Sequence, residues 1–202
     1  MQYFTSDTHF FHDQLVGVND FSNRNFIDAA DMDEVIVQNW NEKVKPNDTV
    51  YHLGDIAMLH TKPSKLADER IFEILSRLNG HLILIKGNHD SRELFKYLDR
   101  HNFLIDGQPK FEFHDVGVLI KMNHRQYYLT HYPMMLGIVK QIINVHGHLH
   151  RYTVPIKENI NVGPDSGDLD YLKTAVPFGA PLSSTELEEI VTQKGIDFAK
   201  RR

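Results

Sequence analysis

The ends of five short apolar segments constrain this chain more than any other feature of its sequence. Each segment has the length and composition of a strand buried on both faces, and each runs directly into aspartate, asparagine or histidine. The five segments are residues 2–5, 49–53, 82–86, 126–130 and 142–145. Because ligands bind at the carboxyl ends of strands in α/β sheets, these polar side chains predict one shared site.

Helical patterns separate the early apolar segments. The four helical segments are residues 31–44, 64–78, 91–100 and 184–193, the last with Ser184 as its cap. Strands and helices alternate up to about residue 105, and strands then follow one another, with Asn123-His124-Arg125 as a hairpin turn. We therefore predict an α/β fold, a four-layer α/β/β/α sandwich of mixed sheets, in one domain over residues 1–202.

The composition excludes several classes of function. The 202 residues include no cysteine, which excludes disulfides, thiolate zinc sites, iron–sulfur clusters and cysteine nucleophiles. The 13 histidines are spread from His9 to His150, so this excess of a common metal ligand belongs to the folded body. The net charge of −5 argues against sequence-independent coating of nucleic acid. No apolar run could cross a membrane and the first residues lack a secretory pattern, which predicts a cytoplasmic protein.

The residues that follow the five segments suit metal binding. The motifs are Asp7-Thr8-His9, Gly54-Asp55, Gly87-Asn88-His89-Asp90, Thr130-His131 and Gly147-His148-Leu149-His150. The glycine in three of them permits a sharp turn and a close approach of the backbone. Aspartate, asparagine and imidazole suit Mn²⁺, Fe²⁺, Zn²⁺, Co²⁺ and Ni²⁺. Two such ions sharing a carboxylate would favour an anionic substrate, such as a phosphate ester, and activated water as the attacking group.

In this order, over residues 7–150, the motifs resemble those of the calcineurin-like metallophosphoesterase superfamily. The stretch 48–55 and Asn161-Val162-Gly163 also resemble its small bacterial and phage members. The resemblance implies hydrolysis of a phosphoester by a hydroxide that bridges two divalent ions, with Mn²⁺ expected and Fe²⁺, Zn²⁺, Ni²⁺ or Co²⁺ as alternatives. It implies that Asp55 bridges the ions and that His89 is the catalytic residue facing the scissile phosphate. The other implied ligands are Asp7, His9 and His150 for the first ion, and Asn88, His131 and His148 for the second.

The sequence departs from the superfamily pattern after Asp55. Many phosphomonoesterases of the superfamily, including the protein phosphatases, have a second aspartate and an arginine there, whereas this chain has Ile56-Ala57-Met58-Leu59. Because that arginine would bind a terminal phosphate, its absence favours a nucleotide or another small phosphodiester as substrate. A phosphomonoesterase or nuclease of the same fold, and a non-catalytic scaffold that binds protein partners, stay open as alternatives.

Three further residues are candidates for contact with the substrate, namely His12, Arg24 and Arg151. The segment 161–184 is rich in glycine, proline, aspartate and serine, which predicts a solvated loop rather than a calcium site for Asp165, Asp168 and Asp170. We expect a small phosphoester, with nucleotides among the candidates, as the partner of this protein. We expect neither a membrane nor an obligate nucleic-acid partner, and the sequence is compatible with a homo-oligomer.

Overall fold

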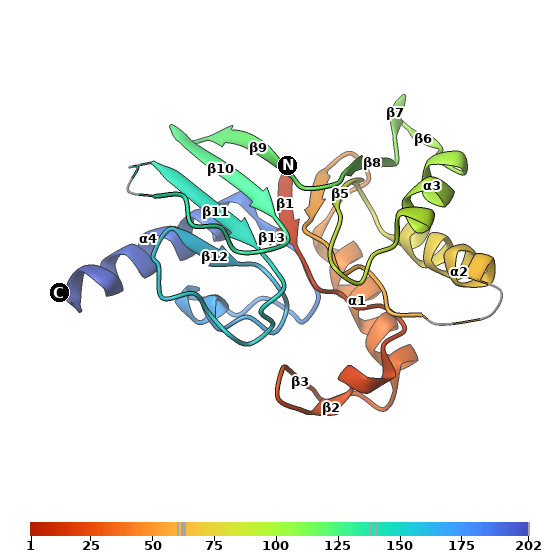
Figure 1. Ribbon diagram of the computed structural model, residues 1–202, viewed down its shortest axis with the longest axis horizontal. Coiled ribbons are helices and arrows are strands. Elements are labelled where there is room, and N and C mark those ends of the chain that lie inside the picture. Colours follow the sequence, from red (N-terminus) through yellow and green to blue (C-terminus); the bar gives the residue numbers. More distant parts are fainter. Residues whose placement is uncertain (60, 62–63, 138, 140, 202) are drawn as a thin grey trace.

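The computed structural model describes residues 1–59, 61, 64–137, 139 and 141–201, and two β-sheets form its centre (Figure 1). In spatial order, the first sheet contains β13 (Leu182–Ser183), β1 (Gln2–Thr5), β4 (Thr49–His52), β5 (His81–Ile85) and β8 (Phe111–His114). All run parallel except β13, which pairs antiparallel with β1. Thr5 pairs with His52 and His52 with Leu84, so the strands that precede the first three motifs end side by side.

The second sheet delivers the remaining motifs. It contains, in spatial order, β12 (Asn159–Asn161), β11 (Ile142–His146), β10 (Arg125–Thr130) and β9 (Gly117–Met122). The first three run parallel, and β9 is antiparallel to β10. Asn123 and His124 join β9 to β10 with φ angles of 49° and 61°, the geometry of a two-residue hairpin turn. The predicted hairpin is therefore confirmed.

Within the described part of the chain, four α-helices pack against the two sheets. They are α1 (Ala29–Lys43), α2 (Ser64–Arg77), α3 (Arg92–Arg100) and α4 (Ser184–Lys200). Figure 1 shows α1, α2 and α3 on the side of the five-stranded sheet and α4 on the side of the four-stranded sheet. The predicted α/β/β/α sandwich of mixed sheets is confirmed. Among the described residues, none of the helices has the length and apolar character that a membrane span requires.

The last helix differs from its prediction at both ends. Ser183, rather than Ser184, is its N-terminal cap: the Ser183 hydroxyl accepts a hydrogen bond from the N–H of Glu186, whose carboxylate accepts one from the N–H of Ser183. The helix continues to Lys200 instead of ending near residue 193. Lys194 explains the extension, because its buried ammonium group holds this part of the helix against the body.

The segment 161–184 is not the solvated loop that its composition predicts. It contains η2 (Gly167–Tyr171) and β13, and the side chain of Asp168 is fully buried. Asp168 forms an ion pair with Lys194 of α4 at 2.7 Å, so each buried charge has an opposite partner. Its carboxylate also accepts a hydrogen bond from the N–H of Asn161 at 2.8 Å.

Short elements lie around the sheets. They are η1 (Asp13–Leu15), the hairpin of β2 (Gly17–Val18) and β3 (Asn23–Arg24), and the hairpin of β6 (Leu104–Ile105) and β7 (Gln108–Pro109). Two buried apolar clusters fill the layers between the sheets and helices. Alternate side chains of β1 point to opposite faces, so Tyr3 joins the cluster that contains Trp40 of α1, and Phe4 joins the cluster between the sheets.

Candidate metal centre

The loops that follow the parallel strands continue to pair beyond the strands themselves. After β1 and β4, the N–H of Asp7 donates to the carbonyl oxygen of Gly54 at 2.9 Å. After β10 and β11, the N–H of Gly147 donates to the carbonyl oxygen of His131 at 3.0 Å. These bonds hold the motif-bearing segments of each sheet side by side, and the polar side chains meet at one edge as the sequence predicts.

Backbone strain is concentrated at this edge. Ten of the described non-glycine residues have φ in the left-handed region, between 47° and 70°. Five of them are predicted metal ligands, namely Asp7, His9, Asp55, His148 and His150. A left-handed backbone costs a residue with a side chain about 1 kcal/mol. Such strain persists only where the surrounding structure fixes the conformation, and it clusters at functional sites.

Two of the motif glycines are required by space. A methyl group on Gly147 would lie 1.6 Å from Oγ of Ser6 and 2.4 Å from Oδ2 of Asp7. A methyl group on Gly87 would lie 2.2 Å from Oδ1 of Asp55. Both distances are far below any van der Waals contact, so only glycine lets these backbones approach the carboxylates.

Asp7, His9 and His150 form the first group of ligand atoms, in which one atom of each residue lies within 4.8 Å of the others. The N–H of His148 donates to both carboxylate oxygens of Asp7, at 2.9 and 3.1 Å, and the Ser6 hydroxyl donates to Oδ2. Burial lowers the pKa of His9 well below its usual value and keeps the ring neutral, as a ligand must be. Neither ring nitrogen of His9 has a hydrogen-bond partner among the described residues, and a metal ion would supply one.

Asp55, His131 and His148 form the second group, again with ligand atoms within 4.8 Å of one another. Oδ1 of Asn88 lies 2.8 Å from Nε2 of His131 and 2.8 Å from Nδ1 of His148. Nδ1 of His131 lies 2.8 Å from the carbonyl oxygen of Leu53. Because a carbonyl oxygen can only accept, Nδ1 carries a proton, and Nε2 is the ring nitrogen that would bind a metal once it is deprotonated.

The carboxylate of Asp55 faces both groups. Its Oδ2 lies 3.7 Å from Nε2 of His9 and 3.4 Å from Nε2 of His131, while its Oδ1 accepts the N–H of His89 at 2.9 Å. Burial raises the pKa of Asp55, but the hydrogen bond and charge of His131 outweigh burial and hold that pKa well below its usual value. An ionised carboxylate that faces imidazole nitrogens attracts a cation, so these residues fit divalent metal ions.

His89 and His12 lie beside the first group. The ring of His89 is exposed, and its centroid lies 5.5 Å from that of His9. The ring of His12 is half-buried, with its centroid 5.1 Å from that of His9. The structure therefore brings both predicted residues to the cluster, and contact of His12 with the substrate stays a prediction.

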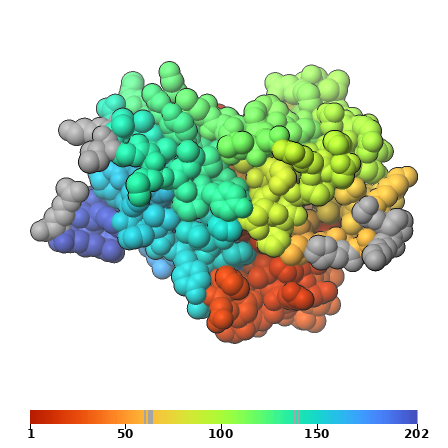
Figure 2. Space-filling view, viewed as in Figure 1, coloured from red at the N-terminus to blue at the C-terminus, as the bar shows by residue number. Residues whose placement is uncertain are grey.

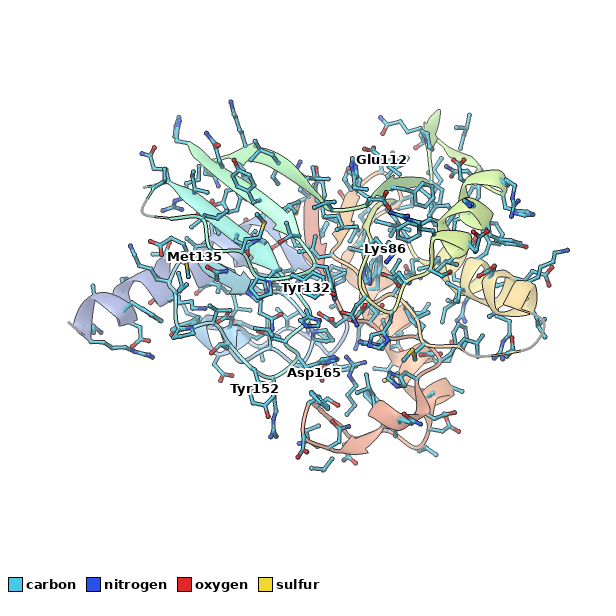
Figure 3. All side chains as sticks on the ribbon, viewed as in Figure 1. Lys86, Glu112, Tyr132, Met135, Tyr152 and Asp165 are labelled. Atoms are coloured by element: carbon cyan, nitrogen blue, oxygen red, sulfur yellow. The ribbon has the colours of Figure 1, made fainter. Side chains whose placement is uncertain are left out.

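The predicted role of Arg24 as a phosphate contact is corrected by the structure. Its guanidinium group is fully buried, pairs with Asp165 at 2.7 Å and donates to the carbonyl oxygens of Asp7 and Thr8 at 2.7 and 2.9 Å. Arg24 therefore supports the backbone of the first ligand instead of the substrate. Oδ2 of Asp165, labelled in Figure 3, also lies 3.3 Å from Nδ1 of His150 and leaves Nε2 of that ring for a metal.

Arg151 lies on the surface beside the first group. Its N–H donates to the carbonyl oxygen of Phe21 at 3.1 Å, and its guanidinium group lies 5.5 Å from the ring centroid of Tyr152. Figure 2 shows the red N-terminal segment in contact with the cyan segment around residue 150. Among the described contacts, none joins the Arg151 side chain to the ligand groups, and its contact with the substrate stays a prediction.

Asp90 is a supporting residue to which the sequence assigned no role. It is 3% exposed, and its carboxylate accepts hydrogen bonds from the N–H groups of Asp55 and Gly87, both at 2.8 Å, and of Ile56 at 2.9 Å. Asp90 therefore ties the loop after β4 to the loop after β5. Its place in the motif, two residues after Asn88, was the available signal.

A mixed α/β sandwich with aspartate, asparagine and histidine gathered at its strand ends is the arrangement of a metal-dependent phosphoesterase. The model of the calcineurin-like phosphoesterase family matches residues 3–188, and the chain belongs to this family. The resemblance that the motifs indicate is thereby confirmed. Membership supports hydrolysis of phosphoesters with divalent metal ions.

Two similar proteins cover much of the chain. An uncharacterized protein of Methanocaldococcus jannaschii is 31% identical over 138 residues, which are 66% of this chain and 74% of that protein. The crystal structure of a protein of unknown function from Aquifex aeolicus has a TM-score of 0.61 and 25% sequence identity, and the match covers 94% of this chain and 98% of that one. The structural similarity agrees with the fold, and neither description names a substrate.

Proposed function

We propose that this protein is a dinuclear phosphodiesterase that hydrolyses a nucleotide or another small phosphodiester. The position of Asp55 carries the proposal. Its Oδ2 faces one histidine of each ligand group, at 3.7 Å from His9 and 3.4 Å from His131. One carboxylate oxygen between two groups of ligands suits a pair of ions held close together for phosphoryl transfer to water.

Each ion would have three ligands besides Asp55. The ligands would be Asp7, His9 and His150 for the first ion, and Asn88, His131 and His148 for the second. Oxygen and imidazole donors without sulfur suit Mn²⁺, which we propose as the metal. Bound ions supply positive charge at the phosphoryl oxygens and activate the attacking water.

His89 is proposed as the residue that assists the leaving oxygen. Its N–H is fixed on Oδ1 of Asp55 at 2.9 Å, while its ring is exposed beside His9. The main chain is therefore held in place and the imidazole can reach a substrate bound at the ligand groups. From there it can donate a proton to the leaving oxygen or stabilise negative charge in the transition state.

The surroundings of Asp55 support a diester rather than a monoester. Ile56 and Ala57 follow it as buried apolar residues, and the guanidinium group of Arg24 is occupied by Asp165. The residues after Asp55 therefore supply no guanidinium group, and that of Arg24 is not free to bind the additional negative charge of a monoester. A diester has one charge fewer and can be neutralised by the bound ions.

The proposal is tested with bis-p-nitrophenyl phosphate and p-nitrophenyl phosphate, assayed side by side. Chelator-stripped protein is compared with protein reloaded with Mn²⁺, and bound metal is counted by elemental analysis. We expect two ions per chain, faster turnover of the diester, and activity that depends on the metal. His89→Asn should lower kcat by about 100-fold or more, the usual contribution of a general acid.

His124→Asn is the matched control. His124 lies exposed in the hairpin turn between β9 and β10, at a φ of 61° that asparagine accepts. The substitution should therefore leave kcat unchanged. Preference for the monoester would contradict the diesterase. One bound ion would contradict the dinuclear site. Bound metal without turnover of either ester would favour the non-catalytic scaffold.

A further inference from the structure

Tyr132 presents an exposed aromatic ring directly beside the second ligand group. The residue is 52% exposed, although it follows the ligand His131. Its ring centroid lies 5.0 Å from that of His131 and 4.6 Å from that of His148, both in edge-on geometry. Figure 3 shows Tyr132 near the middle of the molecule, at the carboxyl end of β10. The ring thus borders the place where the scissile phosphate would lie.

The backbone around Tyr132 is held firmly in spite of this exposure. The Thr130 hydroxyl donates to the carbonyl oxygen of Tyr132 at 2.6 Å. Asn144, which is fully buried, accepts the N–H of Met134 at 2.7 Å, and Asn159 donates to the carbonyl oxygen of Met134 at 3.0 Å. Buried side chains of three strands therefore fix the loop that carries the ring. An exposed aromatic ring on a fixed loop loses little conformational entropy when a planar ligand stacks on it.

We propose that Tyr132 determines specificity by stacking on the base of a nucleotide whose phosphate lies at the ligand groups. This inference rests on the proposed phosphodiesterase function and narrows its substrate class to phosphodiesters of nucleosides. In a nucleotide, the sugar separates the base from the phosphate. In this site, the imidazole rings of His131 and His148 separate the Tyr132 ring from the place of the ions, so a base could reach the ring while its phosphate lies at the ligand groups. Aromatic rings bind bases through their π faces without reading their edges, so the identity of the base would matter little.

The test uses two substrates that share one chromogenic leaving group. Thymidine 5′-(p-nitrophenyl phosphate) carries a base on the retained side, and methyl p-nitrophenyl phosphate carries none. We expect Tyr132→Ala to raise KM for the thymidine ester about tenfold and to leave kcat unchanged. KM for the methyl ester should stay within about twofold. Tyr132→Phe keeps the ring and should match the wild type with both esters.

A binding measurement separates this inference from the proposed function. Calorimetric titration of the Mn²⁺-loaded protein with thymidine 5′-phosphate and with methyl phosphate needs no turnover. Tyr132→Ala should weaken binding of the first about tenfold and leave the second unchanged. This result without turnover would support the base contact while refuting the diesterase.

Two outcomes would overturn the role of Tyr132. Equal losses with both esters and both phosphates would show that the ring only positions His131 and His148. No loss with either pair would show that the exposed ring does not touch the substrate.

Discussion

Asp90 offers the sharpest test of how the loops are held together, because one buried carboxylate serves three backbone donors. Its Oδ2 accepts the N–H groups of Asp55 and Gly87 at 2.8 Å, and its Oδ1 accepts the N–H of Ile56 at 2.9 Å. In Asp90→Asn, the amide oxygen can keep the first two bonds, and the amide nitrogen then faces the N–H of Ile56. In Asp90→Ala, all three donors lose their acceptor.

The magnitudes follow from the number of buried donors left without an acceptor. One such donor costs about 1–3 kcal/mol, so we expect Asp90→Asn to lower the free energy of unfolding by about 2 kcal/mol. Asp90→Ala should cost at least about 3 kcal/mol. For a chain of this size, 2 kcal/mol corresponds to a decrease in Tm of about 4–8 °C.

Urea unfolding followed by circular dichroism, with chelator present, measures this cost apart from metal binding. Burial raises the pKa of Asp90 to about 6, so an experiment at about pH 8 keeps the carboxylate ionised. Asp99→Asn, on the exposed face of α3, is the matched control. The reasoning is refuted if Asp90→Asn changes the free energy by less than about 0.5 kcal/mol, or if Asp90→Ala costs no more than Asp90→Asn.

Three further predictions concern space and charge. Gly147→Ala would place a methyl group 2.4 Å from Oδ2 of Asp7 and should weaken Mn²⁺ binding at least about tenfold in calorimetry; unchanged affinity would contradict the steric argument. Gly195→Ala, inside α4 with open space around it, should raise the free energy of unfolding by about 0.5–1 kcal/mol, and a decrease would show crowding there. Burial lowers the pKa of Lys110 from its usual 10.5 to about 7. Between these two pH values the folded state binds fewer protons than the unfolded state, so the free energy of unfolding should rise with pH. Lys110→Met should lose this rise in urea unfolding, and a rise that persists would assign it to another group.

The sequence predicts the candidate site well because its residues follow their strands directly. Asp7 comes two residues after β1, and His131 comes directly after β10. Once such segments are recognised as parallel strands, the carboxyl ends within each sheet must meet at one edge, whatever the loops between them do. This places three motifs together in the first sheet and two in the second, and the packing of the two sheets then brings the two sets to one site.

The supporting residues could not be predicted, because their partners are distant in the sequence. Arg24 and Asp165 are separated by 141 residues, and Asp168 and Lys194 by 26. Each of the four is charged, and charged residues mostly lie on the solvated surface. Their burial depends on the opposite charge that the fold places beside each of them, and the sequence does not show that pairing. Composition alone therefore misjudged the segment 161–184 and the role of Arg24.

The strained ligands and the buried polar residues around them belong to one arrangement. Five ligands with left-handed backbones, at about 1 kcal/mol each, cost about 5 kcal/mol, which is comparable to the whole stability of a small domain. Hydrogen bonds with charged side chains offset this cost: the carboxylate of Asp90 accepts the N–H of Asp55, and Arg24 donates to the carbonyl oxygen of Asp7. These bonds involve protein groups alone, so they fix the backbone of Asp55 and Asp7 independently of any contact with a metal ion. Metal affinity then reflects the donor atoms themselves, and a change at Asp90 or Arg24 should reduce stability and metal binding together.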